Sequence, residues 1–188
     1  MKIVLGITGA SGSIYAKYFI QAIKDTEAIV HIVPSKTGAS VLEYELNVDS
    51  IRDIIPIDSI AKYKLENYDD FFASIASGSY KVDKTIILPA SMSTVASIAA
   101  GVCNNLIHRA ASIALKEKRS LVIGFRESPL TAIDLSNLLH LAEAGAVIMP
   151  LAPGFYHKPT DIDDIVKFMV GKILDSLNID NDLFMRWS

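Results

Sequence analysis

The stretch of sequence that decides the fold is "KIVLGITGASGSIYA", residues 2–16. Its first part, 2–8, is an apolar run rich in β-branched residues, and a loop with two glycines and two serines follows at once. A helical pattern begins directly after that loop. A strand that passes through a glycine-rich loop into a helix is typical of α/β proteins, in which helices connect parallel strands. The stretch therefore predicts an α/β fold with a ligand-binding loop behind its first strand.

The rest of the chain repeats this alternation. The expected strands are 2–8, 28–34, 84–90, 120–125 and 145–150, and the expected helices are 12–23, 37–46, 92–117, 131–143 and 160–176. Continuously apolar strands indicate a parallel sheet that is covered on both faces. We therefore expect a three-layer α/β/α sandwich with a mainly parallel, Rossmann-like sheet. Residues 47–82 fit the pattern poorly, and within 66–80 we expect a helix followed by a flexible loop.

Composition limits the function further. A chain of 188 residues with 51% hydrophobic content predicts one α/β domain, residues 1–188. A net charge of −3 without a basic block supplies no positive field for nucleic acid or a membrane surface. Cys103 is the single cysteine, and no Cys/His cluster has metal-ligand spacing, so we expect no metal and a reducing, cytoplasmic environment.

Neither a secretory signal nor a membrane span is expected. Residues 86–107 are free of charge and long enough to cross a bilayer, but they contain Pro89 and several polar side chains. The first residues form a strand pattern and lack the features of a secretory leader. The mean hydropathy of +0.34 is high for a soluble monomer and favours a buried interface between subunits.

Polar side chains follow the expected strands at their carboxyl ends. They are Ser35 and Lys36, then Ser91, Ser93 and Thr94, then Arg126 and Glu127, and finally Tyr156, His157 and Lys158. In parallel sheets these ends share one edge, to which helix N-termini also point. The glycine patterns of dinucleotide and triphosphate sites are absent. We therefore expect five strand ends to form one crevice for a mononucleotide-sized, phosphate-bearing ligand, although each Ser or Thr alone could be a helix cap.

Several segments together carry a resemblance to a known family. "GITGASGSIYA", "NNLIHRAASIALKEKR", "RESPL", "GAVIMPLAPGFYHKP" and "LFMRW" resemble the flavin prenyltransferases (UbiX-like) of the homo-oligomeric flavin-containing decarboxylase-like superfamily. The resemblance runs from Met1 to Trp187 and is weakest over 47–82. It implies a metal-independent transferase that joins the prenyl group of dimethylallyl phosphate to N5 and C6 of reduced FMN.

The resemblance also implies partners and an assembly. The product, prenylated FMN, would serve a UbiD-like decarboxylase in pathways such as ubiquinone biosynthesis. Members of the family form homododecamers with active sites at subunit interfaces, so this chain is expected to be a homo-oligomer of that kind.

Site residues follow from the same resemblance. FMN would contact Gly9, Ala10, Ser11, Ser35, Ser91, Met92, Ser93, Thr94 and Arg126. The catalytic set would be Ser11, Glu45, Glu127, Lys116 and Arg109, and the prenyl phosphate would contact Arg109, Lys116, Glu127, Tyr156 and Lys172. The family often has Arg at the position of Lys172 and Cys at that of Ala90. The first change keeps the charge but loses the two-pronged contact of a guanidinium, so it bears on phosphate affinity.

The chemistry of these side chains suits the reaction. A departing phosphate is doubly charged, so cations must face it. Arg109 and Lys116 are seven residues apart and share one face of the expected helix, which could also be a plain solvated face. Glu127 could accept a proton that the flavin loses, or simply pair with Arg126. Without the resemblance, Glu45 could be a plain surface residue.

An allylic cation also needs dry, electron-rich walls. Trp187 is a candidate for such a wall, together with Phe155 and Tyr156, although a C-terminal Trp could also anchor the chain end.

Two other functions stay open. An FMN-dependent cysteine-type decarboxylase would share the turn "PAS" at 89–91, but its relatives carry a segment of the type "PxMNxxMW" that this chain lacks. A non-enzymatic flavin-binding protein would need the crevice but would have no use for the cations Arg109, Lys116 and Lys172.

Overall fold

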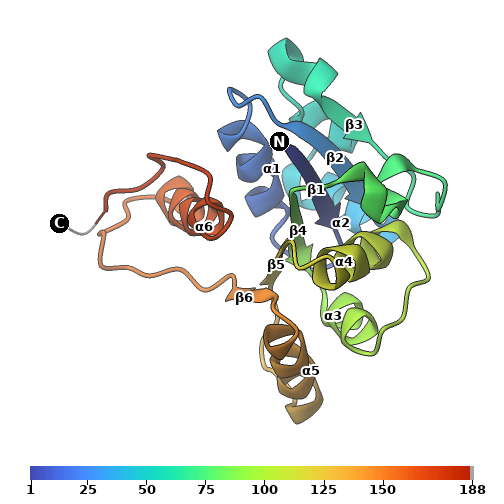
Figure 1. Ribbon diagram of the computed structural model, residues 1–188. Coiled ribbons are helices and arrows are strands. Elements are labelled where there is room, and N and C mark those ends of the chain that lie inside the picture. Colours follow the sequence, from blue (N-terminus) through green and yellow to red (C-terminus); the bar gives the residue numbers. More distant parts are fainter. Residues whose placement is uncertain (187–188) are drawn as a thin grey trace.

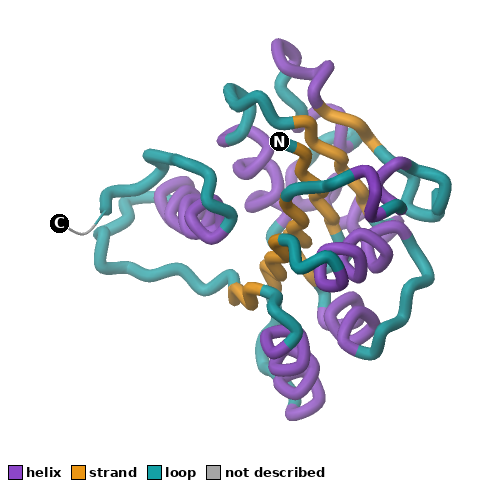
Figure 2. The backbone as a smooth tube through the Cα atoms, in the orientation of Figure 1, coloured by secondary structure: helices purple, strands orange, loops and turns teal. Residues whose placement is uncertain are grey.

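The sheet of this protein has six parallel strands in the order β3-β2-β1-β4-β5-β6 (Figures 1 and 2). The structure is a computed structural model that describes residues 1–186. The strands are β1 (Lys2–Ile7), β2 (Ile29–Pro34), β3 (Tyr63–Leu65), β4 (Lys84–Ala90), β5 (Ser120–Phe125) and β6 (Val147–Pro150). The parallel arrangement brings the carboxyl ends of all strands to one edge, as the sequence predicted.

Helices cover both faces of the sheet, which confirms the three-layer architecture. One core packs α1 (Ser13–Ala22), α2 (Lys36–Leu46) and α6 (Ile162–Ser176), and the other packs α3 (Met92–Ala99), α4 (Leu106–Lys116) and α5 (Ala132–Glu143). Alternation along β1 divides its side chains between the two cores, since Ile3, Leu5 and Ile7 enter the first and Val4 enters the second. The strands are apolar throughout because both faces are buried.

The single helix expected over 92–117 is wrong, because the chain forms α3 and α4 with a loop between them. Gly101 in that loop has a φ of +72°, a left-handed conformation that ends a helix readily. Asn105 then starts α4, and its side-chain oxygen accepts the His108 N–H at 2.9 Å. Among residues 1–186, no helix is long and apolar enough to cross a bilayer.

The segment between α2 and β4 differs from expectation. It contains the short edge strand β3, which the sequence did not predict, and 3₁₀ helices η1 (Ile51–Ile54), η2 (Ile57–Lys62), η3 (Ser74–Ala76) and η4 (Gly78–Tyr80). The helix expected within 66–80 is wrong, since only turns and two 3₁₀ helices occur there. Fully buried His31 joins this segment to β2, with Nδ1 2.6 Å from Glu66 Oε1 and Nε2 3.1 Å from Tyr80 Oη.

Candidate functional site

A cavity of about 270 Å³ lies at the carboxyl ends of β1, β2 and β4. Its walls are Thr8, Gly9, Ser35, Lys36, Thr37, Tyr68, Ser91, Ser93 and Thr94. A second cavity of about 400 Å³ shares Ser35, Lys36 and Tyr68 with the first, so the two are adjacent. The walls combine hydroxyl groups with backbone near the start of two helices. This is the polar edge that the sequence predicted.

Two glycines let α2 begin against the end of β1. A Cβ atom at Gly9 would lie 2.6 Å from Cγ2 of Thr37. A Cβ atom at Gly38 would overlap the carbonyl oxygen of Ile7 and lie 2.9 Å from its carbonyl carbon. That carbonyl oxygen accepts the Ser35 N–H at 2.8 Å, and the Ser35 hydroxyl caps α2 by accepting the Gly38 N–H at 3.0 Å. Close packing therefore fixes the N-terminus of α2 at the cavity wall.

Thr8 performs the corresponding role for α3. Its side chain is 3% exposed, donates to the Pro89 carbonyl oxygen at 2.8 Å and accepts the Ser91 N–H at 2.8 Å. Ser91 in turn caps α3, and its hydroxyl oxygen lies 3.1 Å from the hydroxyl oxygens of both Ser93 and Thr94. Ser35 and Ser91 are thus helix caps and cavity walls at once. Two helix N-termini at one cavity favour an anionic ligand group.

Glu45 joins α2 to the loop that follows β1. Its carboxylate accepts the Gly12 N–H at 3.0 Å and the Ser13 N–H at 2.8 Å, and so it caps α1 from outside that helix. Burial of the carboxylate is the largest influence on its pKa and raises it. Hydrogen bonds from the Ser11 hydroxyl and from the N–H groups of Ser13 and Gly12 outweigh burial, so the pKa of Glu45 lies below its ordinary value of 4.5. Glu45 therefore stays ionised and holds residues 11–13.

Replacing Glu45 with glutamine should loosen this loop, because the charged Oε2 atom accepts both N–H groups and the neutral amide oxygen of glutamine would accept them more weakly. A lowered pKa in the folded state gives stability that is fully present above pH 4.5 and is lost as the pH falls through that lower pKa. The difference in unfolding free energy between wild type and Glu45→Gln should therefore shrink in acid. Chemical denaturation at a series of pH values measures it, and a constant difference would contradict the assignment. Glu43→Gln, on the same helix, is the control that should keep neutral-pH stability.

The expected crevice shared by five strand ends is wrong in one respect, because its walls come from the ends of β1, β2 and β4 and from Tyr68. After β6 the chain runs away from the sheet edge toward α6 (Figure 1). Tyr156 is 59% exposed in this connection, and its ring packs edge-on against Phe168 with centroids 5.6 Å apart. Lys172 is exposed on α6. Trp187 lies outside the described residues.

Arg126 and Glu127 follow β5 but do not line the cavity. Arg126 is partly buried, and its Nε atom is buried without a hydrogen-bond partner within residues 1–186. Glu127 is exposed and accepts the Ser128 N–H at 3.0 Å. In the part of the chain that the structure describes, no ion pair joins the two side chains. The alternative of a simple Arg126–Glu127 pair is therefore not what the structure shows.

Arg109 and Lys116 both lie on α4, at different distances from the cavity edge. Arg109 Nε donates to the Ala76 carbonyl oxygen at 2.9 Å. Lys116 lies at the end of α4, four residues before β5 begins, and Nζ is 3.3 Å from Glu117 Oε1. The start of α4 is tied to the cavity by the Leu106 N–H, which donates to the Tyr68 carbonyl oxygen. Lys116 therefore lies at the opposite edge of the sheet, about 15 Å along the helix from that start.

Of the nine expected flavin contacts, the structure brings Gly9, Ser35, Ser91, Ser93 and Thr94 together at the cavity. Ala10, Ser11 and Met92 are chain neighbours of these residues. Sequence reasoning missed Thr8, Thr37 and Tyr68. Thr8 and Thr37 could have been found from their places directly after β1 and at the start of α2. Tyr68 could not, because no repeating pattern covers its segment.

The arrangement can bind a phosphate-bearing ligand through neutral donors. Burial first, and then the charge of Asp69, raise the pKa of Tyr68, so its hydroxyl stays protonated. Lys36 adds one cation, 85% exposed, with Nζ 3.5 Å from Asp69 Oδ2. Across residues 1–186, no group of three or more His, Cys, Asp or Glu side chains could hold a metal ion. The side chains that line the cavity offer a ligand hydrogen bonds from hydroxyl groups and one exposed positive charge.

Known proteins resemble this chain along nearly its whole length. Residues 1–174 match the protein family described as Flavoprotein. The chain is 46% identical over 187 residues to a Methanocaldococcus jannaschii protein named flavin prenyltransferase UbiX, and the match covers 100% of this chain and 98% of that relative.

Two solved structures share the fold closely. AnUbiX (PadA1) in complex with FMN and dimethylallyl pyrophosphate has a TM-score of 0.90 and 37% identity, covering 100% of this chain and 97% of that one. A dodecameric FMN-dependent UbiX-like decarboxylase from Escherichia coli O157:H7 has a TM-score of 0.91 and 37% identity, covering 100% of both chains. These likenesses agree with the resemblance found in the sequence.

Proposed function

Because the chain belongs to the flavin prenyltransferase family of flavoproteins, we propose that it joins the dimethylallyl group of dimethylallyl phosphate to N5 and C6 of reduced FMN. The observation that carries the proposal is the cavity at the ends of β1, β2 and β4, where hydroxyl groups and two helix N-termini suit a phosphate-bearing ligand. The product, prenylated FMN, would pass to a UbiD-like decarboxylase. Neither a cysteine-type decarboxylase nor a flavin carrier is favoured by a specific observation.

FMN supplies the nucleophilic nitrogen and carbon atoms that become bonded to the prenyl group. The residues assigned to hold it are Gly9, Ala10, Ser11, Ser35, Ser91, Met92, Ser93, Thr94 and Arg126. The buried Nε of Arg126, which lacks a partner within residues 1–186, is a donor that a phosphate or ring oxygen would satisfy. The close approach of Gly9 to Thr37 leaves backbone, rather than a side chain, at one wall. These features fit FMN.

The chain's cations are assigned to the leaving phosphate. The allylic C–O bond breaks with both electrons going to the phosphate oxygen, and charge accumulates there. Arg109, Lys116 and Lys172 would stabilise this charge, with the Tyr156 hydroxyl as a further donor. Each charge-assisted contact contributes roughly 1.5–3 kcal/mol. Lysine at 172 binds as a point charge and so contributes less geometric specificity than arginine would.

Proton transfer is assigned to Glu127. N5 and C6 each lose a proton when they become bonded to carbon, and the alkene gains one. A carboxylate that is exposed and has no ion pair among the described residues is available to carry these protons. Ser11 and Glu45 would hold the loop at the reacting face of the ring, as the contacts of Glu45 suggest. Trp187 remains assigned as an aromatic wall for the prenyl group.

We propose that several copies of the chain complete each site. Lys116 lies at the sheet edge opposite the cavity, so its assigned role requires a neighbouring copy. Exposed apolar side chains on α5, namely Ile133, Leu135 and Leu139, provide surface for such contacts. The related E. coli protein is dodecameric, and we propose the same for this chain. We further propose that residues 1–188 form one domain that works in the cytoplasm.

Anaerobic incubation with reduced FMN and dimethylallyl phosphate tests the proposed reaction. Mass spectrometry of the extracted flavin should show an increase of one isoprene unit, and the absorbance spectrum should change with it. The diphosphate ester serves as a parallel substrate, because AnUbiX holds dimethylallyl pyrophosphate. A flavin that keeps its original mass with both esters would refute the proposal.

A further inference from the structure

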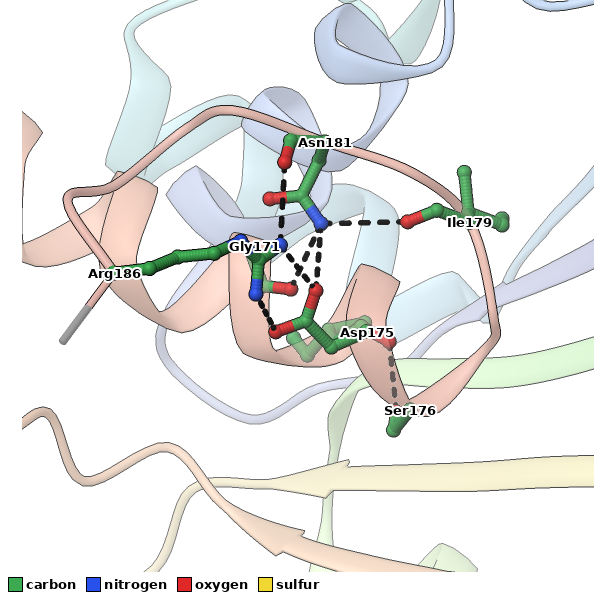
Figure 3. A network of polar contacts seen from close by, with 7 residues as sticks. Gly171, Asp175, Ser176, Ile179, Asn181 and Arg186 are labelled. Carbon is green, nitrogen blue, oxygen red and sulfur yellow. Dashed lines mark hydrogen bonds and ion pairs between the residues drawn. The ribbon is translucent and has the colours of Figure 1, made fainter. Parts of the chain in front are cut away.

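The end of the chain folds back onto α6 and is fixed there by an ion pair (Figure 3). Arg186 gives two parallel hydrogen bonds to the carboxylate of Asp175, Nη1 to Oδ2 at 3.0 Å and Nη2 to Oδ1 at 2.8 Å. Nη2 also donates to the Asn181 carbonyl oxygen at 3.2 Å. Two-pronged pairs of this kind fix both distance and orientation. The last described residue is therefore tied to a helix eleven positions earlier.

Asn181 reinforces the same attachment. Its amide nitrogen donates to Asp175 Oδ1 at 2.9 Å, and it lies 3.3 Å from the carbonyl oxygens of Gly171 and Ile179. Hydrogen bonds from Arg186, the largest influence, lower the pKa of Asp175. The carboxylate thus remains charged and serves two partners from the returning segment. We call Asp175, Asn181, Phe184 and Arg186 the C-terminal latch.

Phe184 carries the attachment into the apolar side of α6. A Cβ atom at Gly171 would overlap the Phe184 ring, so only glycine lets the ring lie this close to the helix. The Phe184 ring also meets Phe168 of α6, with centroids 5.2 Å apart and planes at 71°. Phe168 is 5% exposed. Edge-to-face contacts between rings have a preferred geometry, so a movement of the Phe184 ring would displace the Phe168 ring.

Phe168 contacts the loop before α6 with its remaining surface. The His157 ring stacks on it at 4.8 Å with planes at 8°, and the Tyr156 ring meets it edge-on at 5.6 Å. Both ring nitrogens of His157 are buried without a hydrogen-bond partner within residues 1–186. The His157 ring therefore rests on its stacking with Phe168 and on an edge contact with the Tyr156 ring, with centroids 6.1 Å apart. A continuous series of ring contacts thus connects the latch to Tyr156.

We propose that the C-terminal latch positions Tyr156 for substrate, so that its residues are positioning residues for the prenyl-phosphate site. This inference rests on the proposed function, which assigns Tyr156 to the phosphate of dimethylallyl phosphate. The latch residues do not line the cavity at β1, β2 and β4. Loss of the latch should therefore weaken binding of the prenyl ester without weakening binding of FMN.

Two variants break the latch at different points. Arg186→Ala removes the ion pair, and Phe184→Ala removes the ring contact while the ion pair remains. Each should raise KM for dimethylallyl phosphate about fivefold, because the loop then spends less time in the binding arrangement, with the Kd of FMN unchanged. Arg186→Lys keeps the charge but can make only one of the two hydrogen bonds. Its KM should therefore lie between the values for wild type and for Arg186→Ala. Asp53→Asn, which removes a carboxylate that caps η1, is the matched control and should keep the wild-type KM.

A readout without flavin tests the latch itself. Trp187 is the only tryptophan and follows Arg186 directly, so its fluorescence anisotropy in flavin-free protein reports how firmly the chain end is held. Both variants should lower the anisotropy, and Asp53→Asn should not. Thermal unfolding verifies that each variant is folded, and Phe184→Leu replaces Phe184→Ala if the latter is not.

A double variant excludes an effect through Lys172. Asp175 lies close enough to Lys172 for their charges to interact, and Arg186→Ala would free its carboxylate to attract that lysine. Arg186→Ala combined with Asp175→Asn removes this attraction and should keep the raised KM. A KM that returns to the wild-type value would overturn the proposal, as would wild-type KM and anisotropy in both single variants. Failure of the wild type to prenylate FMN would instead refute the proposed function, and anisotropy would still test the latch.

Discussion

Replacement of Glu127 with glutamine is expected to slow formation of prenylated FMN by about a hundredfold or more. The substitution preserves size and hydrogen-bonding capacity but removes the ability to accept a proton at neutral pH. The side chain is exposed and accepts only the Ser128 N–H among the hydrogen bonds of the described residues, so the fold does not depend on its charge. The rate should therefore fall while the protein stays folded.

Single-turnover kinetics under anaerobic conditions, with flavin mass as the readout, measures this effect. Binding of FMN, followed separately by fluorescence quenching, should stay within about twofold of wild type, since Glu127 does not line the cavity. Glu27→Gln is the matched control and should keep the wild-type rate, because Glu27 is an exposed glutamate just before the amino end of β2 rather than at a carboxyl end. A rate for Glu127→Gln equal to that of wild type would remove this carboxylate from proton transfer and leave the released phosphate as the base.

Substitution of Gly38 by alanine should destabilise the protein and weaken FMN binding together. Helix propensity alone predicts the opposite, because alanine stabilises a helix interior by about 1 kcal/mol relative to glycine. Here, however, the new methyl group would overlap the Ile7 carbonyl oxygen, and a backbone atom cannot rotate away as a side chain can. Overpacking of this kind costs about 1–3 kcal/mol and sometimes more. We therefore expect a net loss of about 2 kcal/mol.

The same displacement would move Ser35 and the start of α2, which form one wall of the cavity. FMN affinity should fall about tenfold, which corresponds to about 1.4 kcal/mol. Urea denaturation and a flavin titration measure the two effects on one preparation. Ser40→Ala, on the exposed side of the same helix, should change neither quantity appreciably. A Gly38→Ala protein that is more stable than wild type would contradict this prediction, because it would show that α2 and β1 move apart at little cost.

The elements that were predictable from sequence are those with a strong repeating pattern. The run at 2–8 and its partners are apolar because the sheet is covered on both faces, and this pattern specified five of the six strands. The sequence also contains signals for the break between α3 and α4, namely Gly101 and then Asn105. The apolar spacing continues across this break, however, and so predicted a single helix. β3 has only three residues, too few to show any period, and its pairing with β2 depends on tertiary contacts such as the His31–Glu66 hydrogen bond.

The residues of the candidate site were likewise predictable from sequence only in part. Ser35 and Ser91 were predictable because residues that directly follow parallel strands must meet at one edge. The position of Lys116 was not predictable. The spacing of residues along α4 predicts which of them share a face of the helix, but it does not predict at which edge of the sheet the helix ends. Thr8 shows a third case. Its hydroxyl serves two backbone groups of the segment 89–91, a long-range contact that no local pattern encodes.

The strand order has a consequence for the order of assembly during protein synthesis. β1 is made first and occupies the middle of the sheet, where it pairs with β2 on one side and with β4 on the other. The nascent chain can complete the first pairing early, but one side of β1 keeps unpaired amide and carbonyl groups until residues 84–90 have left the ribosome. Until then, that exposed edge has to be protected in the growing polypeptide, by chaperones or by rapid elongation. The strand that needs this protection, β1, is the same strand whose carboxyl end later forms part of the ligand pocket.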